Sequence, residues 1–305
     1  MPSSFSLMFM YTGYIRRCFT GAGLWSQALK VDDENETTVH FWGPRNKTAQ
    51  KPSLVLIHGF GPEATWQWRR QVKFLAPHFN LYVPDLIFFG RSKTRSSERS
   101  ETFQAASMGK LLDKLEVEKF HVAGTSYGGI VAYNLAKMLG QHRVQKVVIA
   151  SSGVNMTKSS NVALLQRAQL DIIDNLMLPA TPQHLRKLMS LTIYKPPSGL
   201  PDFFLKDFLD KLYSENRKEK LELLEGLTIG RDDTSNILPL QQEVLVVWGE
   251  RDQIFPLQLA HELKEYGNQY KGKIGIDKGG IPYASNGKAS RIQQDSLKFL
   301  TGEFL

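Results

Sequence analysis

Short apolar runs bounded by turn residues recur along the chain and predict β-strands. Between them lie longer segments whose apolar residues recur every three or four positions, the spacing of an amphipathic helix. Strands that alternate with helices predict an α/β fold, a mainly parallel sheet with helices on both faces. The predicted strands are 38–42, 54–57, 80–84, 120–124, 146–150, 244–248 and 271–277, and the predicted helices include 66–76, 103–115, 127–139 and 291–300.

The strand pattern stops between Gly153 and Leu240, where apolar residues recur at helical spacing. Core positions of ordinary helices would explain this spacing. Because the block lies between two strands, however, it predicts a helical cap inserted over the carboxyl edge of the sheet, where ligands bind in α/β folds. We therefore expect an N-terminal helical or irregular segment at 1–34, a core at 35–153 and 241–305, and a cap at 154–240.

The composition fits one large α/β domain or a core domain with an insertion, since 42% of the 305 residues are hydrophobic. The formal net charge of +8 is spread along the chain. Basic residues are not interleaved with aromatic ones, so a solvated surface is expected and nucleic acid is not an expected partner. Attraction to anionic membranes or acidic ligands stays open.

Cys18 is the only cysteine, which excludes an intrachain disulfide and a metal site built on clustered thiolates. A reducing compartment, the cytoplasm, is therefore expected. The N-terminal apolar run is too short to span a bilayer, and its positive charges follow it, unlike those of a secretory signal. Residues 1–31 contain Arg16, Arg17 and Lys30 but no acid, as transit peptides do, so organelle targeting stays open. A helix that packs on the domain or touches a membrane surface is the simpler expectation.

The pentapeptide Gly124-Thr125-Ser126-Tyr127-Gly128 matches the G-x-S-x-G nucleophile elbow. Flanking glycines allow a tight turn from strand to helix, and that turn exposes the serine hydroxyl. The apolar run before it and the helical pattern after it supply the required context. Ser126 is thus the candidate nucleophile.

A second glycine turn, His58-Gly59-Phe60-Gly61, follows the strand predicted at 54–57. Such a turn lets a backbone N–H point toward the space above the serine. Phe60 and Tyr127 are then the candidate oxyanion-hole donors, and each such donor stabilises the tetrahedral intermediate by about 3 to 4 kcal/mol. His58 is expected to be a structural neighbour of this loop rather than a base.

Two further motifs, "VPDLIFFGRS" at 83–92 and "VLVVWGERDQIFP" at 244–256, complete a pattern of four strand ends. With them the chain resembles the α/β-hydrolase superfamily over roughly residues 35 to 300, and it looks most like plant-type esterase and lipase-like members with a helical cap. The resemblance implies Asp252 as the acid of a catalytic triad, with Glu250 as the nearby alternative. It also implies a histidine in a turn before the last helix, where this chain has Gly280.

No histidine follows residue 261, so the expected base for Ser126 is missing from the sequence. Three interpretations stay open: a degenerate hydrolase that binds a ligand or partner, an esterase with an unorthodox base such as Lys278, His261 or water, and an active esterase altered locally around 275–287. Losing the histidine of a worked triad costs about a million-fold in turnover. The seven histidines are His40, His58, His78, His121, His142, His184 and His261.

We therefore expect an esterase- or lipase-type serine hydrolase by ancestry with impaired catalysis, or else a non-catalytic ligand-binding or partner-binding protein. No cofactor and no metal are expected. A serine at the elbow disfavours haloalkane and epoxide hydrolases, which carry aspartate there. The expected ligand is a small hydrophobic acyl or aromatic ester, because the cap and loops are rich in apolar residues, among them Phe88, Phe89, Phe203, Phe204 and Phe208.

Overall fold

The computed structural model describes residues 7–234, 237–265, 274–277 and 291–302. Within these residues, eight strands form one sheet in the order β1-β2-β4-β3-β5-β6-β7-β8. β2 is antiparallel to both of its neighbours, and the pairs from β4 to β8 are parallel. The strands are β1 (Leu24–Asp32), β2 (Thr37–Pro44), β3 (Ser53–Ile57), β4 (Asn80–Pro84), β5 (Phe120–Thr125), β6 (Val144–Ala150), β7 (Glu243–Gly249) and β8 (Ile274–Asp277).

Helices cover both faces of this sheet. Successive side chains of a strand point to opposite sides, so strands that are apolar throughout need helices on both faces to bury them. In β3, Leu54 and Leu56 pack with α1, α2, α3 and α12, whereas Val55 and Ile57 pack with α4, α5 and α11. The predicted α/β architecture with a mainly parallel sheet is therefore confirmed. These helices are α1 (Leu7–Gly21), α2 (Ala64–Trp68), α3 (Gln71–Leu75), α4 (Glu101–Lys114), α5 (Tyr127–Arg143), α11 (Leu257–Glu265) and α12 (Arg291–Thr301).

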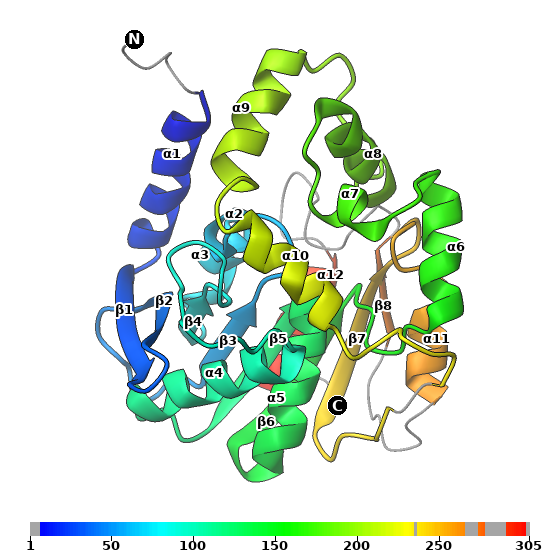
Figure 1. Ribbon diagram of the computed structural model, residues 1–305. Coiled ribbons are helices and arrows are strands. Elements are labelled where there is room, and N and C mark those ends of the chain that lie inside the picture. The colour runs from blue at the N-terminus through cyan, green and yellow to red at the C-terminus, as the bar shows by residue number, and fades with distance from the viewer. Residues whose placement is uncertain (1–6, 235–236, 266–273, 278–290, 303–305) are drawn as a thin grey trace.

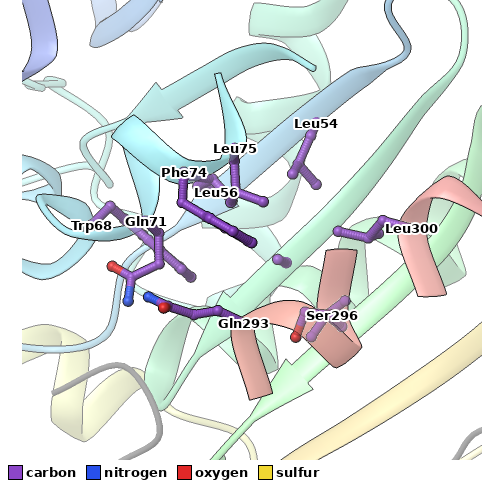
Figure 2. A pocket seen from close by; sticks show the side chains of 11 residues that line it. Leu54, Leu56, Trp68, Gln71, Phe74, Leu75, Gln293, Ser296 and Leu300 are labelled. Atoms are coloured by element: carbon purple, nitrogen blue, oxygen red, sulfur yellow. The ribbon is translucent and has the colours of Figure 1, made fainter. Parts of the chain in front are cut away.

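The contact between α3 and α12 is tightly filled. Figure 2 shows Leu54 of β3 facing Leu300 of α12, with Gln71 and Gln293 close together at one end. The gap between them has a volume of only about 10 Å³, which is about the space of one water molecule. This contact between α3 and α12 is therefore packed core and not a ligand site.

Five helices lie between β6 and β7 in the described part of the chain, where the sequence predicted a helical block. We call them the cap: α6 (Lys158–Ala168), α7 (Ile173–Met177), α8 (Pro182–Thr192), α9 (Asp202–Leu212) and α10 (Arg217–Gly226). In Figure 1, α7, α8 and α9 form the upper part of the molecule, above the sheet.

The two ends of the cap are joined at its base. The Lys158 N–H donates to the Asp232 carbonyl oxygen over 2.8 Å, and the Ser159 N–H donates to the Asp233 carboxylate over 2.8 Å. The Asn161 side chain donates to the Gly230 carbonyl oxygen. We call this set of contacts the cap base. It closes the insertion on itself beside the sheet.

The N-terminal segment contains a strand that the sequence analysis missed. β1 pairs with β2 from Leu24 opposite Pro44 to Asp32 opposite Thr37. Most of its side chains are exposed, so it lacks the apolar alternation that predicts a strand. α1 packs against α2, α3 and α9. None of the helices in the described residues combines the length and apolar character needed to cross a bilayer.

Candidate active site

Ser126 lies at the turn between β5 and α5 with φ 54° and ψ −125°, a strained conformation for a residue with a side chain. The glycines on either side make the turn possible. A Cβ on Gly124 would lie 2.0 Å from the Gly128 carbonyl oxygen, and one on Gly128 would lie 2.4 Å from the carbonyl oxygens of Ile57 and His58. This is the geometry of the predicted elbow.

The backbone of Ser126 is held in place by the end of β6. Its N–H donates to the carbonyl oxygens of Ala150 and Ser151, over 3.0 Å each. Its carbonyl oxygen accepts from the Ser152 hydroxyl over 2.7 Å. Hydrogen bonds of this kind stabilise a strained backbone, so the serine side chain is held at a fixed place at the sheet edge.

The loop after β3 runs against Ser126, since a Cβ on Gly59 would lie 2.8 Å from the serine Cβ. The Gln67 side chain holds this loop: it accepts from the Gly59 N–H over 2.8 Å and donates to the Gly59 and Pro62 carbonyl oxygens over 3.0 and 3.2 Å. The sequence analysis missed Gln67, because no motif marks it.

The predicted oxyanion donors come from two elements: Phe60 lies in the loop after β3, and Tyr127 is the first residue of α5, directly after Ser126. Their rings meet edge to face with centroids 5.6 Å apart. Within the described residues the N–H groups of both lack a hydrogen-bond acceptor. Both groups therefore stay available for the role predicted from the sequence.

A cavity of about 550 Å³ lies between Ser126 and the cap. Its size is within the usual range for a small-molecule site. The lining is mainly apolar, and among the described residues its ionisable side chains are Arg69 and Tyr213, with no carboxylate, lysine or histidine. The cap contributes side chains that include Leu185, Leu188, Met189, Leu200, Phe204 and Phe208.

Asp252 follows β7 and is buried, with 5% of its surface exposed. Its Oδ1 atom accepts from the N–H groups of Ile254 (3.0 Å) and Phe255 (2.9 Å), two residues that also line the cavity. Its Oδ2 atom has no partner among the described residues. Burial raises the pKa of this carboxyl to about 6, against the opposing effect of the hydrogen bonds and of the Ser151 hydroxyl.

The strand ends thus bring Ser126 and Asp252 to one edge of the sheet, with Ser151 between them. Glu250, the alternative acid, is exposed. His261 is exposed on α11 and does not line the cavity. Lys278 and Gly280, the position of the expected histidine, lie outside the described residues.

His58 is fully buried, and both of its ring nitrogens are used. Nδ1 donates to the Gly59 carbonyl oxygen over 2.8 Å, and Nε2 accepts from the Leu86 N–H over 2.9 Å. Burial lowers the pKa of this imidazole, which favours the neutral ring. His58 therefore supports the loop beside Ser126 and cannot serve as its base without losing these contacts.

A second serine, histidine and aspartate lie in series away from the cavity. Ser26 Oγ is 2.7 Å from His40 Nε2, and His40 Nδ1 is 2.7 Å from Asp85 Oδ2. Asp85 Oδ1 accepts from the Ala64 N–H at the start of α2. Ser26 is exposed on the edge strand β1 and does not line the cavity. This series joins β1, β2 and α2, and the sequence analysis missed it.

Comparison with known proteins agrees with this architecture. Residues 52–280 match a family model described as the alpha/beta hydrolase fold. A 2-hydroxy-6-oxononadienedioate/2-hydroxy-6-oxononatrienedioate hydrolase of Pseudomonas putida is 28% identical over 68% of this chain and 74% of its own length. A pimeloyl-[acyl-carrier protein] methyl ester esterase of Vibrio campbellii is 28% identical over 71% of this chain and 82% of its own length.

A solved structure of a 2-hydroxy-6-oxo-6-phenylhexa-2,4-dienoate hydrolase from a Rhodococcus species superimposes with a TM-score of 0.71. The match covers 92% of this chain and 99% of that one at 21% identity. At this level of identity the likeness concerns the fold alone.

Proposed function

Since the chain belongs to the α/β hydrolase fold family, we propose that it binds a hydrophobic acyl or aromatic ester in the cavity above Ser126 and hydrolyses it far more slowly than an enzyme with a complete triad. One observation carries this proposal: Ser126 stands in an elbow at the edge of an apolar cavity of about 550 Å³ whose described lining contains no base. The relatives that hydrolyse esters and related carbonyl compounds support the reaction class.

In the proposed reaction, Ser126 Oγ attacks the ester carbonyl carbon, and the N–H groups of Phe60 and Tyr127 stabilise the oxygen that becomes negative. Proton removal from the hydroxyl is the weak step. A triad would use a histidine oriented by Asp252, but Gly280 occupies the position where the family pattern has it. In this proposal water accepts the proton instead, and the residual rate over water, about a thousand-fold, comes from binding and the oxyanion hole.

A second candidate is a ligand-binding protein without catalysis. It is favoured by the same lining, because apolar side chains and one arginine suffice to bind an ester but not to transfer a proton. The two candidates share the ligand class and differ in turnover.

Labelling with a fluorophosphonate probe tests the proposal, because labelling depends on activation of the serine hydroxyl. Weak or absent labelling is expected, together with slow hydrolysis of 4-nitrophenyl butyrate that is lost in Ser126→Ala. Mass spectrometry of the labelled peptide separates Ser126 from Ser26, which also has a histidine neighbour. Strong labelling at Ser126, abolished in Ser126→Ala, would overturn the impaired-enzyme proposal.

The binding part is tested separately. An apolar ester that fills the cavity is expected to raise the melting temperature. The substitution Leu188→Trp would fill part of the cavity from α8 and is expected to remove this shift. A ligand shift that Leu188→Trp leaves unchanged would place the ligand elsewhere.

A further inference from the structure

One surface of the molecule exposes large apolar side chains in an unusual concentration. On α1, Phe9, Met10 and Tyr14 have 77%, 56% and 59% of their surface exposed. Met10, Tyr14 and Arg17 follow one another at spacings of four and three residues, so they share one side of the helix. A Cβ on Gly13, in the same stretch, would have no atom within 4 Å. We call Phe9, Met10, Tyr14 and Arg17 the α1 face; more than half of the surface of each of its three apolar side chains is exposed.

Basic residues lie on α1 and near the helices that pack against it. α1 carries Arg16 and Arg17 and no acid. Of the helices that pack against it, α3 carries Lys73, and Arg69 and Arg70 lie between α2 and α3. Glu63, which precedes α2, is the acid next to these helices in the sequence and is partly buried. Basic residues therefore outnumber acidic ones on α1, α2 and α3.

α9, the cap helix that packs beside α1, does not add to this charge. Its exposed Phe203 adds apolar surface, but its three aspartates, Asp202, Asp207 and Asp210, outnumber its two lysines. Asp202 pairs with Arg186 over 2.6 Å, and Asp207 accepts from the Met8 N–H. The basic residues of this region therefore belong to α1 and its neighbours α2 and α3 and not to α9 (Figure 1 shows the place of α1).

Aromatic rings connect the α1 helix to the cavity. The Tyr11 ring lies 5.1 Å from the Trp66 ring, and the Trp66 ring lies 5.5 Å from the Phe208 ring. Trp66 and Phe208 both line the cavity above Ser126, as does Arg69. A series of aromatic contacts thus links α1 to the wall of the cavity.

We propose that the α1 face docks on an anionic lipid bilayer, with Phe9 and Met10 in the outer acyl region, Tyr14 at the headgroup level, and Arg17 and Lys73 on lipid phosphates. Apolar and aromatic side chains next to basic ones characterise helices that lie in a membrane interface. α1 has 15 residues, fewer than a span needs, so the contact is peripheral. Docking itself does not depend on the proposed hydrolysis.

Cosedimentation of the full chain with vesicles tests docking. The protein is expected to bind vesicles of phosphatidylcholine with about 30% phosphatidylserine. Its affinity for these vesicles should fall by about tenfold in 0.5 M NaCl. The variant Phe9→Ser/Met10→Ser/Tyr14→Ser should lose at least about tenfold in affinity through lost apolar burial. Arg17→Glu/Lys73→Glu should lose a similar factor through lost attraction.

A matched control replaces exposed apolar residues of the cap, Val162→Ser/Ile172→Ser, and should bind as the parent does. Ser126→Ala should also bind as the parent does, which separates docking from hydrolysis. Circular dichroism checks that each variant is folded. Failure of the parent to bind these vesicles, or equal binding of the parent and both α1-face variants, overturns the proposal. A dimer in light scattering that the apolar variant converts to a monomer also overturns it, because a second copy would then cover the face.

Discussion

Replacing Asp252 by asparagine should make the protein more stable at neutral and alkaline pH. The carboxyl is buried, and its pKa is raised from an ordinary 3.8 to about 6. Folding therefore favours the protonated form. The stability that this preference contributes is fully present below pH 3.8 and is lost as the pH rises through about 6. Asparagine has no charge to bury, so the variant should not show this loss.

The size of the effect follows from the pKa. The rise corresponds to about 3 kcal/mol for the ionised form. Asparagine keeps an oxygen that can accept from the Ile254 and Phe255 N–H groups, but its amide N–H₂ takes the place of the unpartnered Oδ2. A buried amide without partners costs about 1 to 2 kcal/mol. The expected net gain at pH 8 is about 1 to 2 kcal/mol, and below pH 3.8, where the carboxyl is protonated in both states, the variant should be less stable by about the same amount.

Urea unfolding of the parent and of Asp252→Asn between pH 4 and pH 8 measures this difference. Glu250→Gln is the matched control, because Glu250 is two residues away and exposed, and it should change stability by less than about 0.5 kcal/mol. If Asp252→Asn instead destabilises the protein at pH 8, the carboxylate has a cationic partner. The reasoning about a missing base would then be wrong.

Three further predictions concern the elbow, the cap and the missing histidine. Gly128→Ala should destabilise the fold by more than about 3 kcal/mol in thermal unfolding, since its Cβ would lie 2.4 Å from two carbonyl oxygens, whereas Gly109→Ala, whose Cβ would find contacts of 3.8 Å or more, should not. Lys220 is buried, and burial lowers its pKa from 10.5 to about 8, so its charged form is disfavoured in the folded protein. Lys220→Met should therefore stabilise the protein at pH 7 by about 1 to 2 kcal/mol and lose that gain above pH 10.5, and urea unfolding measures both. Gly280→His should raise hydrolysis of 4-nitrophenyl butyrate at least about tenfold, with the gain lost on adding Asp252→Asn; no gain in a folded variant would contradict the assigned position of the histidine.

The parallel part of the sheet could be predicted from the sequence because its strands are buried on both faces and read as continuous apolar runs. β3 and β5 are buried throughout. β1 could not be predicted, because an edge strand open to solvent needs few apolar residues. Its stability comes from pairing with β2, a contact that no local pattern encodes.

The candidate site divides in the same way. Ser126 and Asp252 follow buried strands and stand in motifs, so their meeting at one sheet edge follows from topology. Gln67 contacts Gly59 through side-chain hydrogen bonds from the α2 helix, and Ser26 meets His40 across two paired strands. Partners of this kind depend on tertiary geometry and carry no sequence signal.

The cap base has a consequence for how the chain folds. β6 and β7 are neighbours in the sheet, with Ala150 opposite Val247, yet the whole cap separates them in sequence. Closing a flexible loop of roughly 90 residues costs about 4 kcal/mol in chain entropy before the strands gain any contact. A cap that first closes on itself, through Lys158 and Asp232, holds its ends together and shortens the loop that remains to be closed. Weakening the cap base should therefore slow folding of the sheet more than it accelerates unfolding, although its residues lie outside the strands.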